Sequence, residues 1–158
     1  MLTARQRLLA AVVDSLGGLK LNRFPDRLLL QKRMFLLTMS GVDLGYPFSW
    51  YLRGPYSASL TKDAFGINEE RRKGTFEPSS LPVALRTQLD VVRHGLSSTW
   101  DDPEKIELAA SVLFLSKSGP VDEEAIWKRL AELKPYKEYA IADVRSAVAL
   151  LRSRGFWR

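Results

Sequence analysis

We expect a mainly α-helical protein: a compact domain of about seven helices with one short extended segment. Three observations of the sequence predict this fold class. Apolar residues recur at helical spacing along most of the chain, N-capping residues and Gly or Pro breaks separate these periodic stretches, and alternation with a period of two is confined to residues 48–53. The 158 residues, 46% of them hydrophobic, are enough to bury a core, so we expect one domain over residues 1–158.

The first two predicted helices begin at Thr3, a suitable N-cap, and at Pro25, a residue suited to a first helical turn. They end at Gly17-Gly18 and at Gly41. Apolar residues surround most of the second helix: Leu29, Leu30, Met34, Phe35, Leu36 and Leu37. A helix of this kind should lie at the centre of the core.

Residues 48–53 alternate apolar and polar side chains, which is the pattern of a half-buried extended segment, although the segment is too short to form a sheet alone. Gly54-Pro55 should make the turn that follows. Ser57 or Ser59 can then cap a third helix, which continues to about Phe65.

Residues 66–80 contain two glycines, one proline and two serines around the charge run of residues 69–73, so we expect a long surface loop. Arg71, Arg72 and Lys73 form the basic end of that run. They are candidate contacts with a partner, and a solvated loop is the simpler explanation of the same charges.

The second half is predicted to hold four more helices. Pro82 opens the first, and Asp102-Pro103-Glu104 combines an N-cap with a first turn for the second. Ser118-Gly119-Pro120 and Lys134-Pro135 separate the remaining two. Those two helices cover about residues 122–133 and 141–154. They form, with the helix before them, a C-terminal three-helix part that is compatible with a winged helix.

The composition removes most catalytic chemistry. With no cysteine, disulfides, thiolate nucleophiles and Cys-type zinc sites are excluded. The single histidine, His94, lies near a helix end, which favours a surface histidine over a catalytic base. The carboxylate pairs Asp101-Asp102 and Glu123-Glu124 lie in predicted first turns, where negative charge complements the helix dipole. We therefore expect no enzymatic activity, no cofactor and no metal.

The formal net charge is +6, and the excess is uneven. Residues 1–79 hold 12 Lys and Arg against 7 Asp and Glu, whereas residues 80–158 hold 12 against 11. This basic N-terminal half favours an anionic partner. The sequence contains no apolar run of membrane-spanning length and no signal-peptide core, so we expect a cytoplasmic protein without membrane contact.

Nucleic-acid binding is the alternative function. The last two helices, joined by a short Pro-containing connection, resemble a helix-turn-helix, with residues 156–158 as the stub of a wing. Arg145 and Arg152 would then join the basic run 71–73 as candidate phosphate contacts. Nearby glutamates make this half nearly neutral, and three-helix packing without DNA explains the same pattern.

The segment around Gly54 has two interpretations, and a surface for a protein partner is the sharper of them. Lys32, Tyr51, Arg53 and Tyr56 are expected to converge on one surface, and aromatic and Arg side chains are typical anchors of protein interfaces. The simpler interpretation, favoured for the corner itself, is that this strand-to-helix corner is architecture alone, with Trp50 and Tyr56 as core or boundary aromatics.

Five motifs carry a resemblance to a known family: Leu30-Gln31-Lys32, Phe35-Leu36-Leu37, Phe48-x-Trp50-Tyr51-x-x-Gly54-Pro55-Tyr56-Ser57, Ile106-Glu107-Leu108-Ala109-Ala110-Ser111 and Leu133-Lys134-Pro135. Together they resemble the Panacea-type domain, a small helical module of prokaryotic antitoxins. The resemblance implies an intracellular protein that recognises and neutralises a toxin, or otherwise regulates through contacts, without enzymatic activity of its own.

Overall fold

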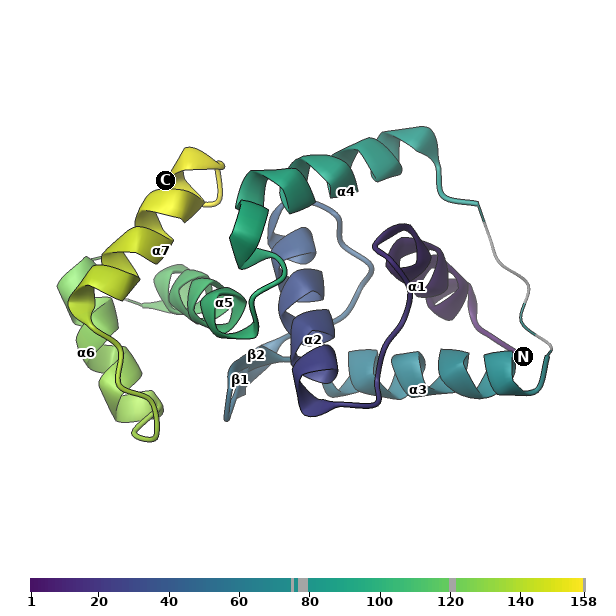
Figure 1. Cartoon of the computed structure of the whole chain (residues 1–158), viewed down its shortest axis with the longest axis horizontal. Coiled ribbons are helices and arrows are strands. Elements are labelled where there is room, and N and C mark those ends of the chain that lie inside the picture. Colours follow the sequence, from purple (N-terminus) through teal and green to yellow (C-terminus); the bar gives the residue numbers. More distant parts are fainter. Residues whose placement is uncertain (75, 77–79, 120–121, 158) are drawn as a thin grey trace.

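The computed structural model describes residues 1–74, 76, 80–119 and 122–157. Within these residues seven α-helices and one two-stranded hairpin form the fold, which confirms the mainly helical class (Figure 1). The elements are α1 (Ala4–Ser15), α2 (Phe24–Met39), β1 (Ser49–Tyr51), β2 (Gly54–Tyr56), α3 (Ala58–Arg72), α4 (Val83–Leu96), a short 3₁₀ turn (Ser97–Thr99), α5 (Pro103–Ser118), α6 (Glu123–Leu133) and α7 (Ile141–Ser153).

The helix starts follow the capping residues of the sequence. The Thr3 hydroxyl accepts a hydrogen bond from the Gln6 amide at 3.1 Å, and the Gln6 side chain accepts one from the Thr3 amide at 2.9 Å, so α1 begins with a complete capping box. The Asp102 carboxylate accepts from the amides of Glu104 and Lys105, at 3.0 and 3.2 Å, and starts α5. The predicted starts of α1 and α5 are therefore confirmed.

Helix α2 lies at the centre of the molecule, as its wide apolar surface predicted. It packs against α5 and the hairpin, while α1 packs against α3 on one side and α6 and α7 pack together on the other (Figure 1). The buried apolar side chains form one cluster that extends from α1 to α7. Among the described residues, no helix has both the length and the apolar character needed to cross a membrane.

The hairpin corrects the predicted turn. Ser49 pairs with Tyr56 and Tyr51 pairs with Gly54 in an antiparallel register, so Leu52 and Arg53 form the turn and Gly54 belongs to the second strand. Gly54 has φ of +100°, which an L side chain rarely adopts, and this lets the chain reverse immediately before it. The extended segment is thus half of a small sheet.

Helix α3 is longer than predicted. Ser57 caps it, with its hydroxyl accepting from the Leu60 amide at 3.3 Å, but the helix runs on to Arg72 through the region expected to be a loop. Gly66 is suited to its interior because α1 lies close by: a Cβ there would be 2.6 Å from the side-chain nitrogen Nε2 of Gln6. Tertiary packing thus outweighs the polar, glycine-containing sequence. Residues 75 and 77–79 of the expected loop lie outside the described residues.

The wing suggested by the C-terminal sequence is not present in the described residues. Phe156 and Trp157, expected to begin it, are buried against the core, and residues 80–119 and 122–157 contain no strand. Burial removes both aromatic surfaces from water, which stabilises this arrangement over a projecting wing. The C-terminal part is a three-helix packing of α5, α6 and α7. His94 is exposed in the last turn of α4, as expected.

Candidate functional site

The four residues chosen as partner contacts line one groove. Lys32, Tyr51, Arg53 and Tyr56 meet around a space of about 470 Å³ between α2, the hairpin and the start of α3. Other residues that the groove uses are Phe24, Arg27, Gln31, Leu52, Thr61 and Phe65. We call this space the α2–hairpin groove. The contribution of α3, through Thr61 and Phe65, was not predicted from the sequence.

Arg53 lies at the tip of the hairpin between two aromatic rings. Its guanidinium carbon is 5.3 Å from the centre of the Phe24 ring and 4.9 Å from the centre of the Tyr136 ring. The Tyr136 hydroxyl donates a hydrogen bond to the Leu52 carbonyl, which ties the same tip to the connection between α6 and α7. Within the described residues, Arg53 has no ion pair and no hydrogen-bond acceptor for its five N–H donors.

Large apolar side chains surround Arg53 at the surface. Tyr51 is 58% exposed and Leu52 is 64% exposed. The Tyr51 ring contacts the ring of the half-buried Tyr56 in a tilted arrangement, with 5.4 Å between the ring centres. Phe24, Phe65 and Tyr136 are also exposed. Single exposed apolar residues are common on proteins, whereas Phe24, Tyr51, Leu52 and Phe65 are grouped around one groove.

A chain of hydrogen bonds that starts at Gln31 fixes the position of Tyr56. The Gln31 amide donates to the Ser57 carbonyl at 2.9 Å and to the Thr61 hydroxyl at 2.8 Å, and its oxygen accepts from the Ser57 amide at 2.9 Å. The Thr61 hydroxyl in turn donates to the Tyr56 hydroxyl at 3.1 Å. Gln31 was not among the predicted site residues. Its signal in the sequence is a polar residue that directly follows the three consecutive leucines 28–30 of α2.

Lys32 is buried, which corrects the expectation that it projects from the surface. Its side chain is only 2% exposed, and its ammonium donates a hydrogen bond to the Pro55 carbonyl at 2.7 Å. Burial is the main cause that lowers the pKa of Lys32 to about 7; the charge of Lys134 lowers it further, while Glu107 opposes the shift. Lys32 therefore lies beneath the hairpin and helps to hold it on α2.

A buried ion pair lies next to Lys32. The Lys134 ammonium is 2.8 Å from the Glu107 carboxylate, with both side chains almost completely buried, and the Tyr139 hydroxyl donates to the same carboxylate at 3.2 Å. Burial lowers the pKa of Lys134, and the Glu107 carboxylate opposes that shift. Lys134 also lies 5.7 Å from the centre of the Trp50 ring. The pair joins α5, the α6–α7 connection and the hairpin.

The candidate phosphate contacts are dispersed. Arg71 forms an ion pair with Asp14, and Arg72 lies 3.4 Å from Glu69. Figure 1 shows the end of α3 and helix α7 on opposite sides of the molecule.

The contacts on α7 share one acidic neighbour. Arg145 and Arg152 lie 3.5 and 3.6 Å from the carboxylate of Glu123, at the start of α6. Of the five predicted residues, Lys73 alone has no ion pair among the described residues. Each site is thus partly neutralised by carboxylates of the same chain, and the structure does not bring the two sites together.

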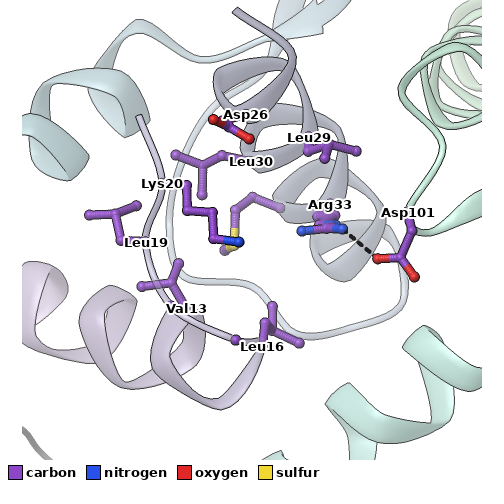
Figure 2. A pocket seen from close by; sticks show the side chains of 12 residues that line it. Val13, Leu16, Leu19, Lys20, Asp26, Leu29, Leu30, Arg33 and Asp101 are labelled. Carbon is purple, nitrogen blue, oxygen red and sulfur yellow. Dashed lines mark hydrogen bonds and ion pairs between the residues drawn. The ribbon is translucent and has the colours of Figure 1, made fainter. Parts of the chain in front are cut away.

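Figure 2 shows a second pocket, of about 280 Å³, between the end of α1 and α2. Arg33 donates to the Trp100 carbonyl at 3.0 Å and to the Asp101 carboxylate at 2.9 Å. Burial lowers the pKa of Arg33, and Asp101 opposes the shift. Lys20 and Asp26 add one charge of each sign (Figure 2). The cations of this pocket are matched by carboxylates, so it offers less to a ligand than the α2–hairpin groove does.

Comparisons with known protein families, with curated proteins and with solved structures each find no match to this chain. Among the described residues, no three His, Cys, Asp or Glu side chains gather in a way that could hold a metal ion.

Proposed function

We propose that this chain is a non-enzymatic protein-binding module of the antitoxin or regulatory type, and that the α2–hairpin groove receives its partner protein. The observation that carries the proposal is the grouping of exposed Phe24, Tyr51, Leu52 and Phe65 around an Arg53 that has no acidic partner among the described residues. Aromatic and Arg side chains beside a groove have the composition of an interface hot spot. The Panacea-type resemblance supplies the antitoxin class.

The two buried lysines support binding rather than chemistry at this site. A reactive amine needs access to a substrate, whereas Lys32 is committed to the Pro55 carbonyl and Lys134 to Glu107. Both hold the hairpin in place. They position the groove, and the exposed residues above them make the contacts.

Nucleic acid is the weaker candidate partner. Binding to a phosphate backbone requires several cations that are free to contact it. Arg71, Arg72, Arg145 and Arg152 each face a carboxylate of the same chain. These ion pairs therefore make nucleic acid a less suitable partner than a protein bound at the groove.

Co-purification tests the proposal. The tagged full chain would be co-expressed with the products of the genes beside its own, and bound protein and nucleic acid would both be identified. The comparison uses Leu52→Ser at the groove and Val91→Ser on α4; these side chains are 64% and 66% exposed, so each change removes a similar exposed apolar group.

We expect a protein to co-purify with the wild-type chain and with Val91→Ser, and to be lost or strongly reduced with Leu52→Ser. Equal recovery by both variants would show that the groove is not the binding site. Recovery of nucleic acid in place of protein, removed by raising the salt concentration, would support the alternative function.

A further inference from the structure

We infer that the partner segment in the α2–hairpin groove is acidic, and that it places an Asp or Glu carboxylate on Arg53 beside an aromatic or aliphatic anchor. This inference rests on the proposed function and specifies the chemistry of the partner. Its starting point is the charge of the groove: Arg27, Lys32 and Arg53 line it, and no Asp or Glu does among the described residues.

These cations differ in how many of their donors are already used within the chain. Arg27 donates to the Leu21 carbonyl at 2.8 Å, and Lys32 donates to the Pro55 carbonyl. Arg53 has no hydrogen-bond acceptor within the described part of the chain. A planar guanidinium with open donors matches the geometry of a carboxylate, which it can bind through two parallel hydrogen bonds.

Arg53 is also prepared for this contact. The Phe24 and Tyr136 rings hold its guanidinium at the tip of the hairpin, and the Tyr136–Leu52 hydrogen bond fixes the tip itself. A side chain that is already ordered loses less conformational entropy when a partner binds. The half-buried position also reduces solvent screening of the charge.

The anchor follows from what surrounds the carboxylate position. Tyr51, Leu52 and Phe65 are exposed, and each lines the groove with apolar surface. An aromatic or aliphatic side chain next to the acidic residue would cover them and exclude water from the ion pair. A basic segment would instead face the cations Arg27 and Arg53, and among the described residues no Asp or Glu lines the groove to attract it.

Selection from a library of displayed random peptides tests this inference on the folded full chain. The wild type and Arg53→Glu would be screened in parallel, with circular dichroism to show that both are folded. We expect the wild type to enrich peptides that carry Asp or Glu next to Phe, Trp or Leu. Arg53→Glu should lose these peptides and should favour Lys or Arg in place of the acidic residue.

Binding of one enriched peptide, measured by fluorescence anisotropy, supplies the magnitude. The affinity should fall about tenfold or more with Arg53→Glu, because a charge-assisted hydrogen bond is replaced by repulsion. Arg53→Lys keeps the charge but loses the paired donors, and should weaken binding by less. Val91→Ser should leave the affinity unchanged.

Three results of the peptide experiments would overturn the inference: enrichment of neutral or basic peptides, equal binding of acidic peptides by Arg53→Glu, or no enrichment at all. An oligonucleotide that displaces the peptide with higher affinity would do so as well. None of these decides the co-purification experiment. If the partner protein is lost with Leu52→Ser but the wild type does not enrich acidic peptides, the proposed function stands and the acidic segment is wrong.

Discussion

At the scale of single residues, the hairpin rests on two buried ammonium groups and one carboxylate. Lys32 and Lys134 share the neighbourhood of Glu107, and only Lys134 pairs with it directly. Three ionisable groups in such a place are expensive unless each has a partner. The Pro55 carbonyl accepts a hydrogen bond from Lys32. The lowered pKa of Lys32 also means that its side chain gives up its charge more readily than an exposed lysine does.

The titration of Lys32 predicts a pH-dependent stability. Its pKa falls from 10.5 to about 7 in the folded protein, so between these values the unfolded chain binds more protons and stability rises with pH. The free energy of unfolding of the wild type, relative to Lys32→Met, should increase by up to about 1.4 kcal/mol per pH unit above pH 7.

Urea unfolding at several pH values measures this difference. Lys62→Met, which removes an exposed lysine, is the control and should follow the wild type across the range. If the free energies of unfolding of the wild type and Lys32→Met change in parallel with pH, Lys32 does not titrate between pH 7 and 10.5.

The buried ion pair predicts a non-additive loss of stability. Glu107→Gln leaves Lys134 charged and without a counter-charge, which should lower the free energy of unfolding by about 3–5 kcal/mol. The double change Glu107→Gln with Lys134→Met removes both charges and should recover part of this loss. Urea unfolding of the two single variants and the double variant gives the coupling energy. Simple additivity of the two losses would contradict the close pairing seen in the structure.

At the scale of elements, the predictable parts were those decided by local chemistry. Thr3, Ser57 and Asp102 are good N-caps in any context, and the structure uses all three. The errors have a tertiary origin. Residues 66–72 are polar and contain a glycine, yet Ile67 is buried and Arg71 pairs with Asp14 of α1, so packing against another helix keeps them helical.

The same reason explains what was missed in the site. A lysine is usually predicted to be exposed to solvent. Nothing in the neighbouring sequence reveals that the Pro55 carbonyl accepts a hydrogen bond from the Lys32 ammonium. The grouping of Lys32, Tyr51, Arg53 and Tyr56 was predictable because three of them lie on one short hairpin. The contribution of Tyr136 was not, since it comes from a distant segment.

The packing of Ile67 tests the extent of α3. Ile67→Ala should lower the free energy of unfolding by about 2–5 kcal/mol, because it leaves a cavity between α3 and the core. Phe65→Ala, at an exposed position of the same helix, should have a much smaller effect. Thermal unfolding of both variants measures the difference. Equal, small effects would favour a solvated loop after Phe65.

The close contact of Gly54 predicts how the hairpin responds to a methyl group. A Cβ at Gly54 would overlap the Ser111 hydroxyl, whereas Gly41 has a similar positive φ and open space around it. Gly41→Ala should therefore measure backbone strain alone, about 1–3 kcal/mol. Gly54→Ala should destabilise by at least about 1 kcal/mol more. Equal losses in urea unfolding would place Ser111 away from the hairpin.

At the scale of the whole molecule, the first half of the chain lines the groove and the second half supports its hairpin. Helices α2 and α3 supply its walls. Tyr136 and Lys134, at the connection between α6 and α7, contact the hairpin at the Leu52 carbonyl and the Trp50 ring. The core that connects these elements extends from α1 to α7. Arg53, which has no ion pair among the described residues, thus lies on a hairpin of the basic N-terminal half, and the C-terminal half holds that hairpin in place.

Site-directed photo-crosslinking in living cells tests the groove most directly. A photoreactive phenylalanine analogue would replace Tyr51 in the groove or Val91 on α4, both of which are exposed, so that each probe reaches whatever protein lies against it. Binding in the α2–hairpin groove predicts a discrete crosslinked protein from position 51 and none from position 91. A crosslink from position 91 with none from position 51 would contradict it.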